Sequence, residues 1–119
     1  MLELVMAIDG VEVQVEWEDN DAVRKLKRLA AEESIHIEAS AYGGFEQVGA
    51  LGESLPTDNV NVTTQPGDVM LYTGNQIVVF YGSNSWSYTR LGKIVGMSDE
   101  ELKELLGKSD VLIEVSKRN

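Results

Sequence analysis

The residues best suited to chemistry concentrate between Tyr81 and Arg90. Gly82 permits a sharp turn in this segment, and Asn84 with its two neighbouring serines offers hydrogen-bond donors and acceptors beside aromatic side chains. Such a mixture suits a peptide or a small polar ligand. The same polar groups also suit a hairpin loop that satisfies its own backbone, so the sequence leaves both interpretations open.

Arg90 is the one arginine in the central part of the chain. Side chains alternate across a strand, so Trp86, Tyr88 and Arg90 are expected on one face, as an aromatic and cationic stripe able to contact a ligand. In the alternative arrangement, Trp86 packs on the sheet and Arg90 forms an ion pair with Asp68 or Glu46. The spacing alone is compatible with both.

Metal and nucleophilic chemistry have little support elsewhere. His36 and Glu38 share a strand face, but His36 is the one histidine and the chain has no cysteine, whereas zinc sites usually use more nitrogen or sulfur ligands. The Gly-x-Ser-x-Gly pattern of hydrolases is absent, and Gly107-Lys108-Ser109 lacks the partner glycine of a phosphate loop. We therefore expect no metal and no cofactor.

The composition favours one domain with no affinity for nucleic acid or membranes. The chain has 119 residues, with 10 basic and 20 acidic side chains and a net charge of -10, which suits a single domain over residues 1–119. The acidic excess disfavours phosphate backbones and anionic lipid surfaces. The first ten residues carry no basic side chain, so we expect no signal peptide, and no apolar run approaches the ~20 residues that a membrane span needs. We expect a cytoplasmic protein that is a monomer or a weak homo-oligomer.

Charge and glycine divide the chain into charged ends and a turn-rich centre. Residues 39–98 hold only four acids and two bases, but nine of the eleven glycines. Binding surfaces are often built on loops, so the centre is where a ligand site is expected.

Local signals predict a hairpin and two capped helices. Apolar residues alternate on both sides of Asp9-Gly10, which is typical of a β-hairpin. One of residues 19–21 is expected to cap an amphipathic helix of about ten to twelve residues. A second helix is expected from Ser98, through a capping box with Glu101, to Gly107.

Short apolar and alternating runs predict about eight strands. They cover residues 2–8, 11–16, 35–39, 60–62, 69–72, 77–81, 86–95 with a break at Gly92, and 111–115. Many short strands with two helices indicate a mainly β chain, with a closed or nearly closed barrel and helices over its open ends.

The run GDVMLYTGNQIVVFYGSNSWSYTRLGKI resembles the small bacterial and archaeal cyclophilin-like proteins, a family of largely undefined function. As in cyclophilins, a Gly-x-Gln strand leads to a Trp ten residues beyond the Gln, here Gln76 and Trp86. The step Gly92-Lys93-Ile94, the helix from Ser98 and the strand ending at Val115 follow in the same order. The resemblance implies a cyclophilin-like fold.

The resemblance also locates a candidate pocket. The Phe that lines the proline pocket of cyclophilin isomerases matches Phe45, but the position of their arginine, five residues earlier, holds Ser40. Their pocket Met and Gln fall on Glu46 and Val48, and a second pocket Phe on Val78. We therefore expect a non-catalytic module that binds a peptide or small ligand. The alternative functions are a weak prolyl isomerase and a structural or assembly partner.

In the isomerase alternative, Arg90 replaces the missing arginine as the catalytic group. The residues expected to contact a ligand are Phe45, Gln47, Gln76, Val78, Tyr81, Asn84, Trp86, Tyr88 and Arg90.

Overall fold

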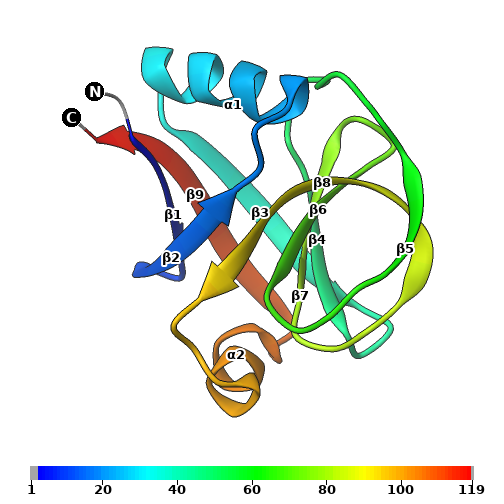
Figure 1. Ribbon diagram of the computed structural model, residues 1–119. Helices are drawn as coiled ribbons and strands as arrows, with labels where there is room; N and C mark the ends of the chain where they lie inside the picture. The colour runs from blue at the N-terminus through cyan, green and yellow to red at the C-terminus, as the bar shows by residue number, and fades with distance from the viewer. Residues whose placement is uncertain (1–2, 119) are drawn as a thin grey trace.

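The structure is a computed structural model that describes residues 3–118. Within this range the chain forms nine strands and two helices (Figure 1). They are β1 (Glu3–Ile8), β2 (Val11–Trp17), α1 (Asp21–Glu32), β3 (Ile35–Tyr42), β4 (Glu46–Ala50), β5 (Val60–Thr63), β6 (Asp68–Tyr72), β7 (Gln76–Phe80), β8 (Ser85–Val95), α2 (Asp99–Leu106) and β9 (Asp110–Arg118).

Eight of the strands form a closed ring. Their order is β2-β1-β9-β3-β4-β7-β6-β8, and β2 pairs with β8 to close it, while β5 pairs with β8 outside the ring. All of these pairings are antiparallel. Figure 1 shows α1 and α2 on opposite sides of the ring. The predicted mainly β fold, with a closed sheet of about eight strands and two helices, is confirmed.

The predicted hairpin and helix caps are confirmed in atomic detail. Asp9 and Gly10 have φ of 49° and 80°, the left-handed pair that a two-residue hairpin turn requires. The Asn20 side chain caps α1 by accepting from the Val23 N–H at 2.9 Å. Ser98 and Glu101 form the capping box of α2.

Two features of the strands differ from the prediction. The predicted break at Gly92 is wrong, because β8 runs through it. A Cβ on Gly92 would lie 2.7 Å from the Glu16 carbonyl, so the glycine allows β2 to approach β8 where the ring closes. Strand β4 was not predicted, because its polar residues Glu46 and Gln47 interrupt any apolar alternation.

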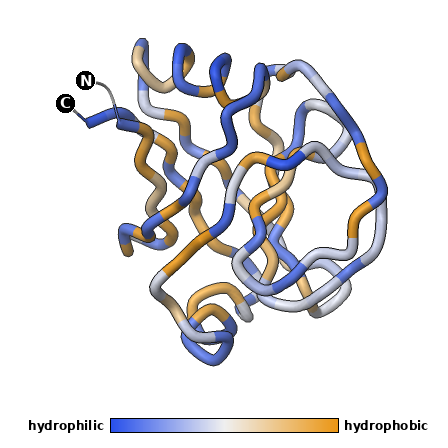
Figure 2. Tube along the Cα trace, in the orientation of Figure 1, coloured by the Kyte–Doolittle hydropathy of each residue, from blue (hydrophilic) through white to orange (hydrophobic). Residues whose placement is uncertain are grey.

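The ring strands β6, β7 and β8 bury apolar residues on both faces. One face joins the main core, which both helices also enter, and so points into the ring. The alternate residues Met70, Val78, Phe80 and Tyr88 form a separate outer cluster. Figure 2 shows apolar and polar residues alternating along much of the chain. No helix within residues 3–118 is long and apolar enough to cross a membrane.

Candidate functional site

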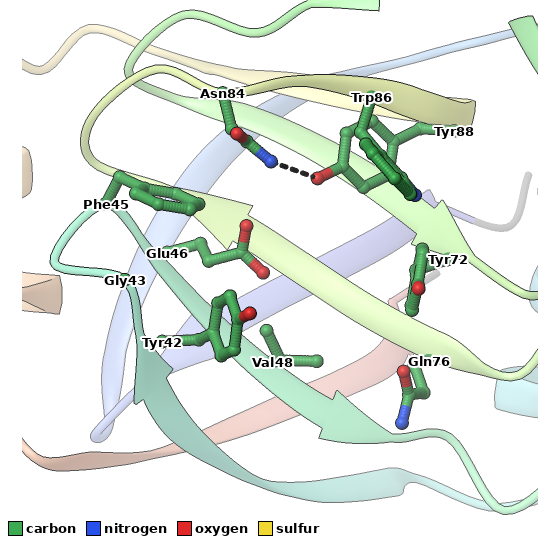
Figure 3. A pocket seen from close by; sticks show the side chains of 10 residues that line it. All are labelled: Tyr42, Gly43, Phe45, Glu46, Val48, Tyr72, Gln76, Asn84, Trp86 and Tyr88. Atoms are coloured by element: carbon green, nitrogen blue, oxygen red, sulfur yellow. Dashed lines mark hydrogen bonds between the residues drawn. The ribbon is translucent and has the colours of Figure 1, made fainter. Parts of the chain in front are cut away.

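A cleft of about 680 Å³ lies on the outer cluster. Its walls come from the end of β3, the turn into β4, strands β4, β6, β7 and β8, and the loop before β8. The lining residues are Tyr42, Gly43, Phe45, Glu46, Val48, Tyr72, Gln76, Asn84, Trp86 and Tyr88 (Figure 3).

Two glycines position Phe45 at one end of the cleft. Gly43 has a φ of 64°, and a Cβ there would lie 2.2 Å from the Phe45 ring. On the other side, a Cβ on Gly82 would lie 2.8 Å from the Phe45 Cβ. The N–H groups of Tyr81 and Gly82 both donate to the Phe45 carbonyl at 3.0 Å. The backbone therefore fixes this side chain from both directions.

Aromatic rings form a continuous chain along and beneath the cleft. Tyr42 packs edge-on against Phe45 with ring centroids 6.1 Å apart, and Phe45 stacks on Phe80 at 6.5 Å. Phe80 packs edge-on against Tyr88 at 5.5 Å, and Tyr88 tilts against Tyr72 at 6.0 Å. Such contacts restrict the rings, so the cleft has a largely preformed aromatic wall.

Hydrogen bonds hold the Asn84 loop in place. The Asn84 N–H donates to the Thr64 hydroxyl at 2.9 Å, and the Thr64 N–H donates to the Asn84 carbonyl at 2.9 Å. The Asn84 side-chain amide then donates to the Tyr88 hydroxyl at 3.0 Å, facing the cleft (Figure 3). Thr64 thus pairs with both backbone groups of Asn84, while the Asn84 side chain lies at the cleft.

Glu46 carries the only carboxyl group among the residues that line the cleft, and the pKa of this carboxyl is raised. Figure 3 shows its carboxyl group among the side chains that line the cleft, and only 5% of the residue is exposed. Burial raises the pKa of this carboxyl from its ordinary 4.5 to about 7, with no opposing hydrogen bond or cation within residues 3–118. Burial also raises the pKa of the neighbouring Tyr88 phenol.

Comparison with known proteins identifies the family. The model of the cyclophilin-like family matches residues 6–116. The chain belongs to this family. Its fold is also similar to the solution structure of a hypothetical protein from Archaeoglobus fulgidus, with a TM-score of 0.61 and 18% identity, covering 99% of this chain and 95% of that chain. At this identity the likeness shows the fold alone. No curated protein matches the chain.

The cyclophilin-like ring brings part of the predicted site together. Residues from the turn after β3, from β7, from the loop before β8 and from β8 itself meet at the cleft, although they are distant in sequence. The predicted ligand residues that line it are Phe45, Gln76, Asn84, Trp86 and Tyr88.

Three other predicted residues do not line the cleft of the cyclophilin-like fold. Val78 is fully buried in the outer cluster beneath the cleft. Gln47 is also fully buried, and its amide donates to the carbonyls of Leu106 and Lys108 at 2.8 and 2.7 Å, so it ties β4 to the end of α2. Tyr81 packs against the main core. None of the three lines the cleft.

Arg90 lies outside the cleft as well. Its guanidinium Nη1 lies 3.8 Å from the buried Asp68 carboxylate, and its carbonyl accepts from the Asn20 side chain at 2.8 Å. Asp68 also lies 3.6 Å from the Lys93 ammonium. The geometry therefore matches the alternative in which Arg90 pairs with Asp68. The predicted stripe of Trp86, Tyr88 and Arg90 contributes only its two aromatic members to the cleft.

Five of the ten residues that line the cleft were not among the ligand residues expected from the sequence. Tyr42, Gly43, Glu46, Val48 and Tyr72 line it but were not expected to contact a ligand. Two signals were available in the sequence. Tyr42 and Gly43 belong to the turn before Phe45, and Glu46 falls on a pocket position of the cyclophilin resemblance.

His36 has a structural partner. Its Nε2 lies 2.7 Å from the Glu114 carboxylate, directly across the β3–β9 pairing. Within residues 3–118, no group of three or more histidine and carboxylate side chains is arranged to hold a metal ion.

Proposed function

We propose that this chain is a non-catalytic module that binds a peptide or small ligand in the cleft over the outer cluster. The observation that carries the proposal is the preformed aromatic cleft itself. Its volume of about 680 Å³ lies within the range typical of small-molecule sites, and its lining combines apolar rings with a few polar groups.

The position of Arg90 favours binding over catalysis. Prolyl isomerisation requires a hydrogen-bond donor aimed at the twisted amide over an apolar seat for the proline ring. Phe45 supplies an apolar wall, but Arg90 lies beside Asp68 and is not a lining residue. No lysine, arginine or histidine lines the cleft as the structure describes it.

Nuclear magnetic resonance titration tests the proposal. A panel of short peptides, amino acids and small aromatic amines is added to the ¹⁵N-labelled protein. We expect at least one member to shift the amide signals around the cleft, including the Trp86 indole. An Ala-Pro peptide with substoichiometric protein is included to detect cis/trans exchange, which we do not expect.

A pair of exposed apolar residues gives a matched control. Trp86 and Leu112 are 59% and 45% exposed, and only Trp86 lines the cleft. We expect Trp86→Ala to weaken binding while Leu112→Ala leaves it unchanged. A panel that shifts no cleft signal, or equal losses in the two variants, would contradict the binding site. Catalysed exchange of the Ala-Pro peptide would instead establish an isomerase.

A further inference from the structure

Glu46 is a buried residue whose carboxyl group has no partner among residues 3–118. Only 5% of the residue is exposed, yet no hydrogen bond or ion pair within residues 3–118 involves its carboxyl group. Burying an unpaired charge costs free energy, so proteins normally pair such groups or leave them exposed. A residue that opposes folding in this way is typical of a functional site.

The second buried carboxylate of the described residues, Asp68, shows what pairing looks like here. Asp68 is 2% exposed, and its carboxylate accepts from the Gln65 N–H at 2.8 Å. The cations of Arg90 and Lys93 lie 3.8 and 3.6 Å from it. The fold thus supplies both a hydrogen bond and cations to one buried acid, and neither to Glu46.

The surroundings of Glu46 suit an organic cation. The aromatic rings that line the cleft with it come from Tyr42, Phe45, Tyr72, Trp86 and Tyr88. Their faces attract ammonium and guanidinium groups, and desolvation strengthens that attraction. The net charge of -10 further favours the approach of cations over anions.

We propose that the ligand of this cleft carries an ammonium or guanidinium group on an apolar body, and that the Glu46 carboxylate binds this cation. The inference rests on the proposed binding function and names the chemical class of its ligand. A metal ion is a poorer fit, because the lining offers a single carboxylate and no second acidic or histidine side chain. The cation supplies the ion pair that the protein leaves unmade.

Charged and neutral probes of the same shape test the inference. The first pair, benzylammonium and benzyl alcohol, has the same ring. The second pair, the peptide acetyl-Gly-Arg-Gly-amide and its citrulline analogue, has the same backbone. The two members of each pair therefore differ mainly in charge. Dissociation constants are measured by nuclear magnetic resonance at about pH 8, where Glu46 is mostly ionised. We expect at least one charged probe to bind about tenfold to a hundredfold more tightly than its neutral partner. The two pairs distinguish a free amine from a peptide side chain as the source of the cation.

Two variants with the same net charge locate the effect. Glu46→Gln removes the buried carboxylate, and Glu104→Gln removes an exposed one on α2. We expect Glu46→Gln to abolish the preference for the charged probe and Glu104→Gln to preserve it. An independent readout in the unmodified protein is the Glu46 carboxyl pKa followed by ¹³C shifts. Benzylammonium should lower it and benzyl alcohol should not.

The outcomes separate the inference from the proposed function. Neutral probes that shift the cleft signals as strongly as charged ones would overturn the cation inference and leave the binding function standing. Charged probes that bind equally well to Glu46→Gln would also overturn it. If neither these probes nor the wider panel shifts any cleft signal, both proposals fail.

Discussion

The two faces of strands β4, β6, β7 and β8 carry different kinds of side chain. The inner face carries Val69, Leu71, Ile77 and Val79 into the main core. The outer face carries an aromatic cluster that supports the cleft. The inner face is covered by the helices and the other ring strands, whereas the outer face carries the open cleft.

Two neighbours on β4 show the difference most directly. Gln47 points inward and donates two hydrogen bonds to the end of α2, while Glu46 points to the cleft with no partner in the described chain. Both residues are buried. Burial alone therefore does not separate the two residues. The Gln47 amide nitrogen is tied to the end of α2, although its Oε1 has no partner within residues 3–118, whereas the Glu46 carboxyl group has no partner there at all and faces the cleft.

The largest expected effect is the loss of stability when a side chain on the inner face is truncated, compared with one on the outer face. Leu71 is fully buried in the main core, and Leu71→Ala should lower the free energy of unfolding by about 2–5 kcal/mol because it leaves a cavity. Trp86→Ala on the cleft rim should lower it by less than about 1 kcal/mol, since the side chain is mostly exposed. Urea denaturation measures both. Equal losses would mean that the cleft wall is part of the folding core.

Glu46→Gln should stabilise the protein at alkaline pH. The folded-state pKa of this carboxyl is about 7 against an ordinary 4.5, so the folded protein binds the proton more tightly than the unfolded chain. Its contribution to stability is therefore fully present below about pH 4.5 and is lost as the pH rises through about 7. At about pH 8 the variant should gain about 2 to 3 kcal/mol over the unmodified protein, and at about pH 4.5 little.

The difference in unfolding free energy between Glu46→Gln and the unmodified protein reports on Glu46 alone, because all other carboxyl groups are present in both proteins. The remaining titratable groups that line the cleft are the phenols of Tyr42, Tyr72 and Tyr88. Denaturation across this pH range, with Glu104→Gln as control, measures the effect. A variant less stable than the unmodified protein at about pH 8 would show that Glu46 has a stabilising partner.

Gln47→Ala should lower the free energy of unfolding by about 1–3 kcal/mol, because it leaves two carbonyls at the end of α2 without their donor. Hydrogen exchange should rise around Leu106. Gln76→Ala is the matched control, since Gln76 is only half-buried and lines the cleft. A similar loss in both variants would contradict the assigned structural role of Gln47.

The smallest effect distinguishes two adjacent glycines. Gly43 and Gly44 have φ of 64° and 72°, so the left-handed backbone alone should cost about 1 kcal/mol with alanine at either position. Only at Gly43 does a Cβ meet the Phe45 ring. Gly43→Ala should therefore also shift the Phe45 and Phe80 ring signals, and Gly44→Ala should not. Unmoved ring signals in Gly43→Ala would show that the glycine does not position Phe45.

Local physics in the sequence determined much of the fold. The Asp9-Gly10 turn, the Ser98 capping box and the apolar alternation depend on residues close together in the chain, so they were predicted correctly. The family followed from the run around Gln76 and Trp86. The turn before Phe45 and the loop at Asn84 were also recognisable in the sequence, and they correctly predicted part of the cleft lining.

Only the tertiary structure decided the partners of the polar residues. Whether Arg90 meets a ligand or Asp68, and whether Glu46 is paired or alone, depends on how β4 and β8 sit among strands distant in sequence. Local patterns predict that an acid or amide is exposed, so β4 and its buried Glu46 were missed. A buried charge is decided by its neighbours in space, and a sequence gives its neighbours only along the chain.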